Sequence, residues 1–219
     1  MEAASSSARG REVRIGDRDL QGTLTCPPAT RGLVIFAHGS GSSRFSPRNT
    51  YVAEALNKRG LGTLLFDLLS DAEARDRRNV FDIPFLSHRV TEAIQWARRD
   101  EAVASLPLGL FGASTGAAAA LMAAAEQPGD ITAVVSRGGR PDLVERVLDR
   151  VRAPTLLIVG GADHEVLRLN EAALEALRTD KHLHVVAGAT HLFEEPGALD
   201  EVVAAAGDWF TERLGGKAA

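Results

Sequence analysis

Six short apolar segments, separated by helical patterns, constrain the fold of this chain more than any other feature of its sequence. They lie at 33–37, 63–66, 108–111, 131–135, 155–159 and 183–186. Continuous apolar runs of this length, without a period of two, predict strands that are buried on both faces. Apolar residues between them recur at helical spacing over 86–97, 166–177 and 199–214. The order strand, helix, strand predicts an α/β fold, a mostly parallel sheet with helices on both faces.

The remaining segments fit a single domain. Residues 1–11 are small, polar and charged, which predicts a flexible tail before one domain that spans 12–216. A patchy strand signal over 13–26 predicts a hairpin at the edge of the sheet. Residues 70–83 are rich in charge and read as a solvated loop or surface helix. Residues 136–154 are too few for a large lid, so we expect no large cap domain and an open site.

Composition excludes several classes of function. A net charge of −4 provides no basic excess for a nucleic-acid partner. No apolar run reaches the roughly 18 residues of a transmembrane helix, and no secretory signal is evident, which predicts a cytoplasmic protein without a membrane partner. The single cysteine, Cys26, and the lack of an H-E-x-x-H pattern or a carboxylate-rich loop predict no metal site. The preference for arginine over lysine indicates a GC-rich bacterial source.

The strand at 108–111 leads into Gly112-Ala113-Ser114-Thr115-Gly116 and then into an alanine-rich helical stretch. This is a G-x-S-x-G elbow in its expected context of strand, tight turn and helix. Such a turn forces the serine backbone into a sparsely populated conformation and exposes Oγ, while the glycines leave room for the neighbouring strand and helix. Ser114 is therefore the candidate nucleophile, with a simple helix-capping serine as the alternative.

A nucleophilic serine needs a base, and the base needs an orienting acid. Asp163 follows the strand at 155–159, and His191 follows the last predicted strand, so the order Ser, Asp, His matches hydrolases of this topology. The alternatives are that Asp163 only caps a helix and that Glu165 or Asp142 supplies the acid. Of the six histidines, His191 alone has a flexible loop position from which an imidazole can reach both partners, and His184 reads as an ordinary strand residue.

The loop after the first buried strand, HGSGSS at 38–43, is the candidate oxyanion loop. We assign the two donors to the backbone N–H groups of Ser40 and Thr115, with Gly41 as the alternative to Ser40. Gly39 and Gly41 are expected to lie against the substrate. The loop could also be only a turn, and it lacks the patterns of a nucleotide-binding loop.

Arg137 and Arg140 follow the strand at 131–135 and reach the same edge of the sheet. Two guanidinium groups there could bind a substrate carboxylate bidentately. The simpler interpretation pairs them with nearby acids such as Asp142 or Glu145.

These motifs resemble those of the alpha/beta-hydrolase superfamily and, within it, the small dienelactone hydrolase-like family. The resemblance covers about 30–214 and rests on HGSGSS (38–43), GASTG (112–116), SRGGRPDL (136–143), GGAD (160–163) and GATHLFEEPGAL (188–199). It implies a three-layer fold and a Ser-Asp-His hydrolase of small esters that needs no cofactor. Dienelactone hydrolases use a cysteine nucleophile where Ser114 stands, so dienelactone itself is not the expected substrate. Related small members occur with phosphoribosyltransferase-like domains, and this chain is not expected to carry one.

The sequence thus predicts a serine-dependent carboxylic ester hydrolase that forms an acyl-enzyme and favours short acyl chains or exposed esters. A thioesterase or acyltransferase would use the same machinery, and a binding module that has lost turnover would keep only the fold. We expect a small-molecule ester as the partner and a monomer or small homo-oligomer.

Overall fold

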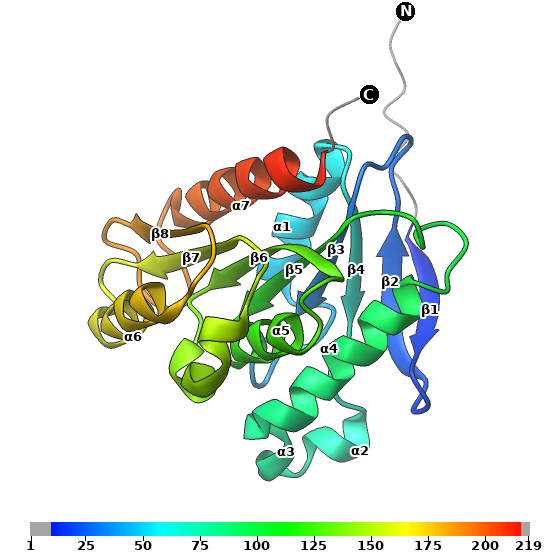
Figure 1. Cartoon of the computed structure of the whole chain (residues 1–219), viewed down its shortest axis with the longest axis horizontal. Coiled ribbons are helices and arrows are strands. Elements are labelled where there is room, and N and C mark those ends of the chain that lie inside the picture. The colour runs from blue at the N-terminus through cyan, green and yellow to red at the C-terminus, as the bar shows by residue number, and fades with distance from the viewer. Residues whose placement is uncertain (1–9, 216–219) are drawn as a thin grey trace, which may run out of the picture.

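An eight-stranded sheet runs through the middle of the molecule in this computed structural model, which describes residues 10–215 (Figure 1). The strands are β1 (Arg11–Ile15), β2 (Leu20–Thr25), β3 (Leu33–Ala37), β4 (Gly62–Phe66), β5 (Leu108–Ala113), β6 (Ile131–Arg137), β7 (Thr155–Gly160) and β8 (Lys181–Val186). Their order in the sheet is β1-β2-β4-β3-β5-β6-β7-β8. The pairs β1–β2 and β2–β4 are antiparallel, and the pairs from β4 to β8 are parallel.

The predicted strands are confirmed, with ends that shift by a residue or two. Strands β3, β4, β5 and β7 are buried along their whole length, as expected for strands covered on both faces. The same expectation is wrong for β8, which is the edge strand and is buried only at Val186. The predicted edge hairpin is β1–β2, which joins the sheet through β4. Of the predicted tail, residues 1–9 lie outside the described residues, and Arg11 already belongs to β1.

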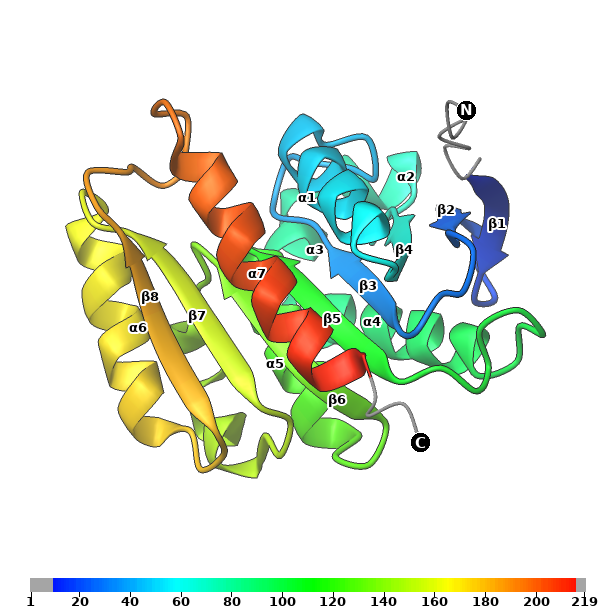
Figure 2. The same ribbon diagram turned by 90° about the horizontal axis from the view of Figure 1, so that it is seen from above.

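Helices cover both faces of the sheet and enclose two apolar cores. On one face, α1 (Pro47–Lys58) packs beside α7 (Ala198–Leu214), which crosses the strands in Figure 2. On the other face lie α4 (Ile83–Ala97), α5 (Thr115–Glu126), α6 (His164–Ala176) and the 3₁₀ helix η1 (Pro141–Arg150). This is the predicted three-layer arrangement, in which the carboxyl ends of the parallel strands share one edge.

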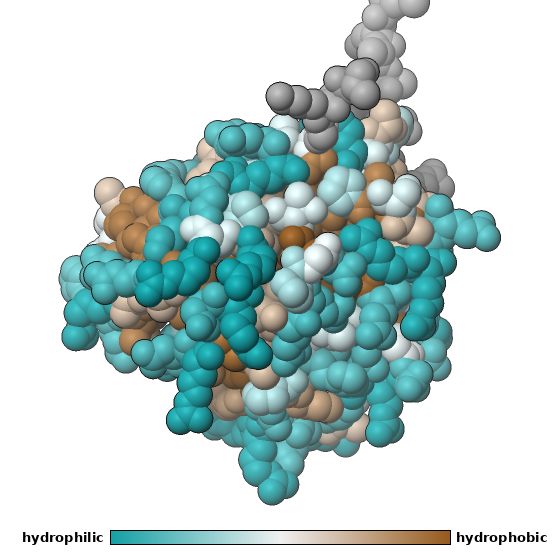
Figure 3. Space-filling view, in the orientation of Figure 1, coloured by the Kyte–Doolittle hydropathy of each residue, from teal (hydrophilic) through white to brown (hydrophobic). Residues whose placement is uncertain are grey.

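The charged segment 70–83 forms two very short helices rather than a loop or one surface helix. These are α2 (Asp71–Ala74) and α3 (Arg77–Phe81), which lie at the lower end of the molecule in Figure 1, next to the start of α4. The surface in Figure 3 is mostly hydrophilic in this region and over the rest of the visible face. In the described part of the chain, no helix has the length and apolar character needed to cross a membrane.

Candidate active site

Ser114 occupies the turn between β5 and α5 in a strained backbone conformation. Its φ of +52° and ψ of −121° lie in a region that L-residues rarely adopt. The N–H of Ser114 donates to the carbonyl of Arg137 at the end of β6, over 3.2 Å. Ser114 begins α5 but makes no side-chain capping bond, so the alternative of a capping serine does not describe its side chain. Strain of this kind is typical of functional positions.

The two glycines of the elbow are required by close backbone contacts. A Cβ on Gly116 would lie 2.2 Å from the carbonyl oxygen of Ala37 and 2.3 Å from that of His38. A Cβ on Gly112 would lie 2.4 Å from Cα of Ala117. Gly116 therefore lets the elbow pack directly against the end of β3, and Gly112 lets β5 pack against the first turn of α5.

Asp163 and His191 meet across the loops that follow β7 and β8. Oδ2 of Asp163 lies 2.7 Å from Nδ1 of His191. Asp163 stands at the N-terminus of α6 yet makes no capping hydrogen bond there, so its side chain serves the histidine rather than the helix. Because the carboxylate can only accept, Nδ1 carries the proton and Nε2 is left as the basic nitrogen. Of the other candidate acids, Asp142 pairs with Arg140 instead.

Hydrogen bonds within the loop hold the turn that carries His191. Oε1 of Glu195 accepts from the N–H and the hydroxyl of Thr190, over 3.0 and 2.6 Å. The hydrogen bond from the Thr190 hydroxyl is the main cause of a lowered pKa of Glu195. Phe193 adopts a left-handed φ of +56° and buries its ring in the core. His191 is thus presented by a fixed turn.

The loop at 137–140 brings Ser114 and His191 to the same place. The N–H of Arg140 donates to the carbonyl of Ser114 over 3.3 Å. A Cβ on Gly138 would lie 3.5 Å from Nδ1 and Cε1 of the His191 ring. Within residues 10–215, Oγ of Ser114 makes no hydrogen bond. Catalytic hydrogen bonds of this type often tighten only when substrate binds.

The predicted oxyanion loop is fixed to the elbow and to the end of β4. The N–H of Ser40 donates to Oγ1 of Thr115 over 3.0 Å, which places the two candidate oxyanion residues side by side. Nε2 of His38 accepts from the N–H of Leu68, and Nδ1 donates to the carbonyl of Gly39, each over 3.0 Å. Burial lowers the pKa of His38 and keeps this imidazole neutral.

The two candidate arginines have different surroundings. Arg140 forms a bidentate pair with Asp142, over 2.8 and 2.7 Å, as the simpler interpretation expected. Arg137 is 8% exposed, and no described carboxylate pairs with it. Nη2 of Arg137 donates a hydrogen bond of 3.4 Å to Oδ1 of Asn49 on α1. Burial, with repulsion from Arg48, lowers the pKa of Arg137 to about 10.

A cavity of about 900 Å³ opens beside the oxyanion loop. Gly39, Ser40, Gly41 and Thr115 line it, whereas Ser114, Asp163 and His191 are not among its lining residues. The outer wall comes from the β1–β2 turn, the residues after β4, and the helices α2 to α4. The sequence did not reveal this wall because its apolar residues are scattered among polar ones without a period. The capping-box pattern at Ser70 and Glu73 was the one local signal. The described residues contain no group of three or more His, Cys, Asp or Glu side chains placed to hold a metal.

Comparisons with known proteins agree with this architecture. A family described as "Alpha/beta hydrolase domain" matches residues 30–204. A dienelactone hydrolase from Anabaena variabilis superposes with a TM-score of 0.92 at 50% identity, over 95% of this chain and 99% of that one. Est1E from Butyrivibrio proteoclasticus superposes with a TM-score of 0.81 at 17% identity, over 95% and 100% of the two chains, and this supports the fold alone.

Two curated relatives from Mycobacterium tuberculosis are 54% identical to this chain over 216 residues. Both carry the provisional name of a phosphoribosyl transferase. The alignment covers 98% of this chain but 49% of each relative, so the chain spans about half the length of the curated relatives it matches.

Proposed function

The chain belongs to the alpha/beta hydrolase domain family, and on that premise we propose that it is a serine hydrolase of carboxylic esters. One observation carries the proposal. The strained serine of the elbow and His191, which pairs with Asp163, follow β5 and β8 and lie against the same loop, 137–140. An activated nucleophile, a base and an orienting acid are the parts that acyl transfer needs.

The reaction follows from the positions of these groups. Nε2 of His191 takes the hydroxyl proton of Ser114 as Oγ attacks the carbonyl carbon of the ester. The N–H groups of Ser40 and Thr115 donate to the developing oxyanion, and the N–H of Ser40 turns from the Thr115 hydroxyl toward it. The C–O bond to the leaving alcohol breaks, and His191 returns the proton to the alcohol oxygen. Water then hydrolyses the acyl-enzyme through the same base and releases the acid.

The name of the mycobacterial relatives describes proteins about twice as long as the matched region. We assign ester hydrolysis to the part represented by this chain, because that part contains Ser114, Asp163 and His191. Phosphoribosyl transfer by the whole relative would then depend on the half that this chain does not match.

Hydrolysis of short p-nitrophenyl esters by wild type and Ser114→Ala tests the proposal. We expect kcat to fall by about four to six orders of magnitude, because the nucleophile is lost while the oxyanion donors and the pocket remain. Ser105→Ala is the matched control, since this exposed serine precedes β5 at the opposite end of the strand from the elbow. Wild-type turnover in Ser114→Ala, or no ester hydrolysis by the wild type, would overturn the proposal.

A further inference from the structure

We infer that the 900 Å³ cavity binds the acyl half of the ester, and that Arg89 holds its outer wall in place through Glu73. This inference rests on the proposed ester hydrolysis and specifies which half of the substrate this chain selects.

The position of the cavity in the sheet indicates which half it binds. Ser114 follows β5, and the cavity lies on the β3–β4 side of it, among residues that follow β3 and β4. His191 and Asp163 follow β8 and β7 on the other side of β5. Because His191 must return a proton to the leaving alcohol, the alcohol half lies on the side of His191. The acyl half is thereby directed toward the cavity.

The cavity offers room and apolar surface for an acyl group larger than acetyl, in contrast to the short acyl chains expected from the sequence. Its apolar side chains, which stand beside charged ones such as Arg18, Arg44 and Asp67, include Leu20, Leu68, Leu69, Val80 and Leu86. Cavities of about 300–1,000 Å³ accommodate ligands of drug size, well beyond a short acyl chain. Each CH₂ group buried against such a surface improves binding by about fourfold.

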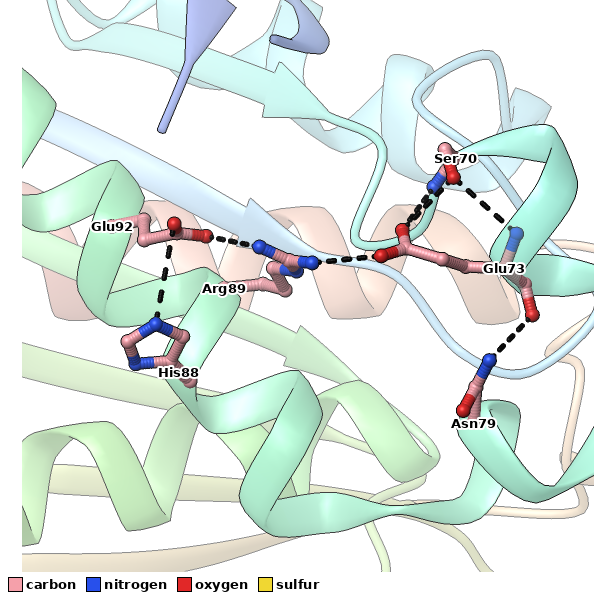
Figure 4. A network of polar contacts seen from close by, with 6 residues as sticks. All are labelled: Ser70, Glu73, Asn79, His88, Arg89 and Glu92. Carbon is pink, nitrogen blue, oxygen red and sulfur yellow. Dashed lines mark hydrogen bonds and ion pairs between the residues drawn. The ribbon is translucent and has the colours of Figure 1, made fainter. Parts of the chain in front are cut away.

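The wall beside this lining cannot hold its shape by itself. Its helices α2 and α3 span only four and five residues, far fewer than an isolated helix needs to be stable. A capping box joins Ser70 and Glu73, in which the N–H of Ser70 donates to Oε2 over 2.9 Å. Nδ2 of Asn79 donates to the carbonyl of Glu73 over 2.9 Å and so connects α3 to α2 (Figure 4). Glu73 is therefore the common point of both helices.

Arg89 connects this point to the core. It is 4% exposed on α4, one turn after the lining residue Leu86. Nη2 donates to Oε1 of Glu73, and Nη1 donates to Oε2 of Glu92, each over 2.8 Å (Figure 4). Desolvation opposes a lowered pKa of Glu73, but the bonds from Ser70 and Arg89 outweigh it and keep the carboxylate charged. Arg89 and Glu73 are thus positioning residues for the wall.

The first experiment fills the cavity. The kcat/KM values of p-nitrophenyl acetate and p-nitrophenyl hexanoate are measured for wild type, Val80→Phe and Arg75→Phe, and their ratio gives the acyl preference. Methyl, butyl and benzyl esters of one acid give the alcohol preference of the same three proteins. Val80 lines the cavity, whereas Arg75 is exposed on the same segment and does not. We expect wild type to favour hexanoate by about tenfold or more. Val80→Phe should reduce this ratio by about tenfold, while Arg75→Phe keeps it and the alcohol preference is the same in all three proteins.

The second experiment releases the wall. Glu73→Gln removes the charge that joins α2 to Arg89, and Glu92→Gln removes the other charged partner of Arg89, which lies within α4. We expect Glu73→Gln to lower the ratio of hexanoate to acetate by about three- to tenfold. Glu92→Gln should leave that ratio at its wild-type value. Because the readout is a ratio of two substrates for one protein sample, a variant with a reduced folded fraction still gives a valid result.

The inference is overturned if Val80→Phe leaves the acyl ratio unchanged, or if it changes the alcohol preference instead. The role of Arg89 and Glu73 in holding the wall is overturned if Glu73→Gln and Glu92→Gln have equal effects on the acyl ratio. These results are distinct from failure of the proposed function, in which hydrolysis would be absent or independent of Ser114 for every ester in both series.

Discussion

The two sides of the catalytic edge are built in different ways. On the triad side, the loops after β5 to β8 are fixed by backbone contacts, glycines and one short carboxylate–imidazole bond. On the pocket side, the β1–β2 turn and the segments after β3 and β4 are held by side-chain bonds between residues far apart in sequence, such as Arg89 with Glu73. Under the proposed function, chemistry and selectivity are encoded separately, and mutations should affect one without the other.

The largest expected effect lies on the triad side. Asp163→Asn should lower kcat by about 10⁴-fold, because an amide can no longer fix the tautomer of His191 or stabilise its cation. The loss should be equal for acetyl and hexanoyl esters, since Asp163 does not line the cavity. Glu165→Gln, which alters an exposed acid two residues away, should retain wild-type kcat. If Glu165→Gln lowers kcat more than Asp163→Asn does, the assignment of the acid to Asp163 is wrong.

A substitution at the junction of the two sides should affect both. Gly116→Ala places a methyl group against the carbonyls of Ala37 and His38, which belong to the backbone and cannot move aside easily. We expect a stability loss of about 1–3 kcal/mol in urea unfolding. A shift of the oxyanion loop by a fraction of an ångström should also lower kcat by up to about 10²-fold. Ala118→Gly, two residues further along α5, measures the effect of an exchange between glycine and alanine on helix propensity. Unchanged stability and unchanged kcat in Gly116→Ala would contradict the packing argument.

A smaller effect separates the two arginines. If esters that carry a free carboxylate are substrates, Arg137→Gln should raise their KM by about five- to twentyfold, because a buried guanidinium without a described carboxylate partner can pair with the substrate. Arg140→Gln should not, since Asp142 already occupies that guanidinium. Neutral esters serve as the internal control. Equal KM changes in the two variants would exclude a carboxylate site at Arg137.

The smallest expected effect concerns the link between β3 and β4. His38 is buried and neutral, and its lowered pKa means that the unfolded chain binds a proton more readily than the native protein. Its contribution to stability is present above the ordinary histidine pKa of about 6.5 and declines as the pH falls below it. Compared with His38→Gln, wild type should lose unfolding free energy below that pH, by at most about 1.4 kcal/mol per pH unit. Parallel stability curves for the two proteins between pH 8 and 5 would contradict this role.

Sequence patterns located the strands and the residues that follow them, whereas they did not reveal the wall of the cavity, and both outcomes have physical reasons. Buried strands are continuous apolar runs, and residues that follow them in a parallel sheet must share one edge, so Ser114, Asp163 and His191 could be brought together without a structure. The hydrogen bond from Thr190 to Glu195, which holds the turn of His191, could not be predicted because such a contact produces no periodic pattern in the sequence.

Other elements were missed because their contacts are long-range. Helix α1 buries only a narrow stripe that includes Val52 and Leu56, and its polar residues hide the pattern. The wall of the cavity mixes apolar and charged residues, and the side chain that we infer to order it is the buried Arg89, a residue type that is usually exposed. Which of two neighbouring arginines has a carboxylate partner likewise depends on the fold and not on the local sequence.

Covalent labelling with a fluorophosphonate probe, followed by peptide mapping, tests the central claim most directly. Such probes react with serines that are activated by a base and an oxyanion hole. The account predicts a single adduct on Ser114 in the wild-type protein and none in Ser114→Ala. An unlabelled wild type, or equal labelling of Ser114→Ala, would contradict it.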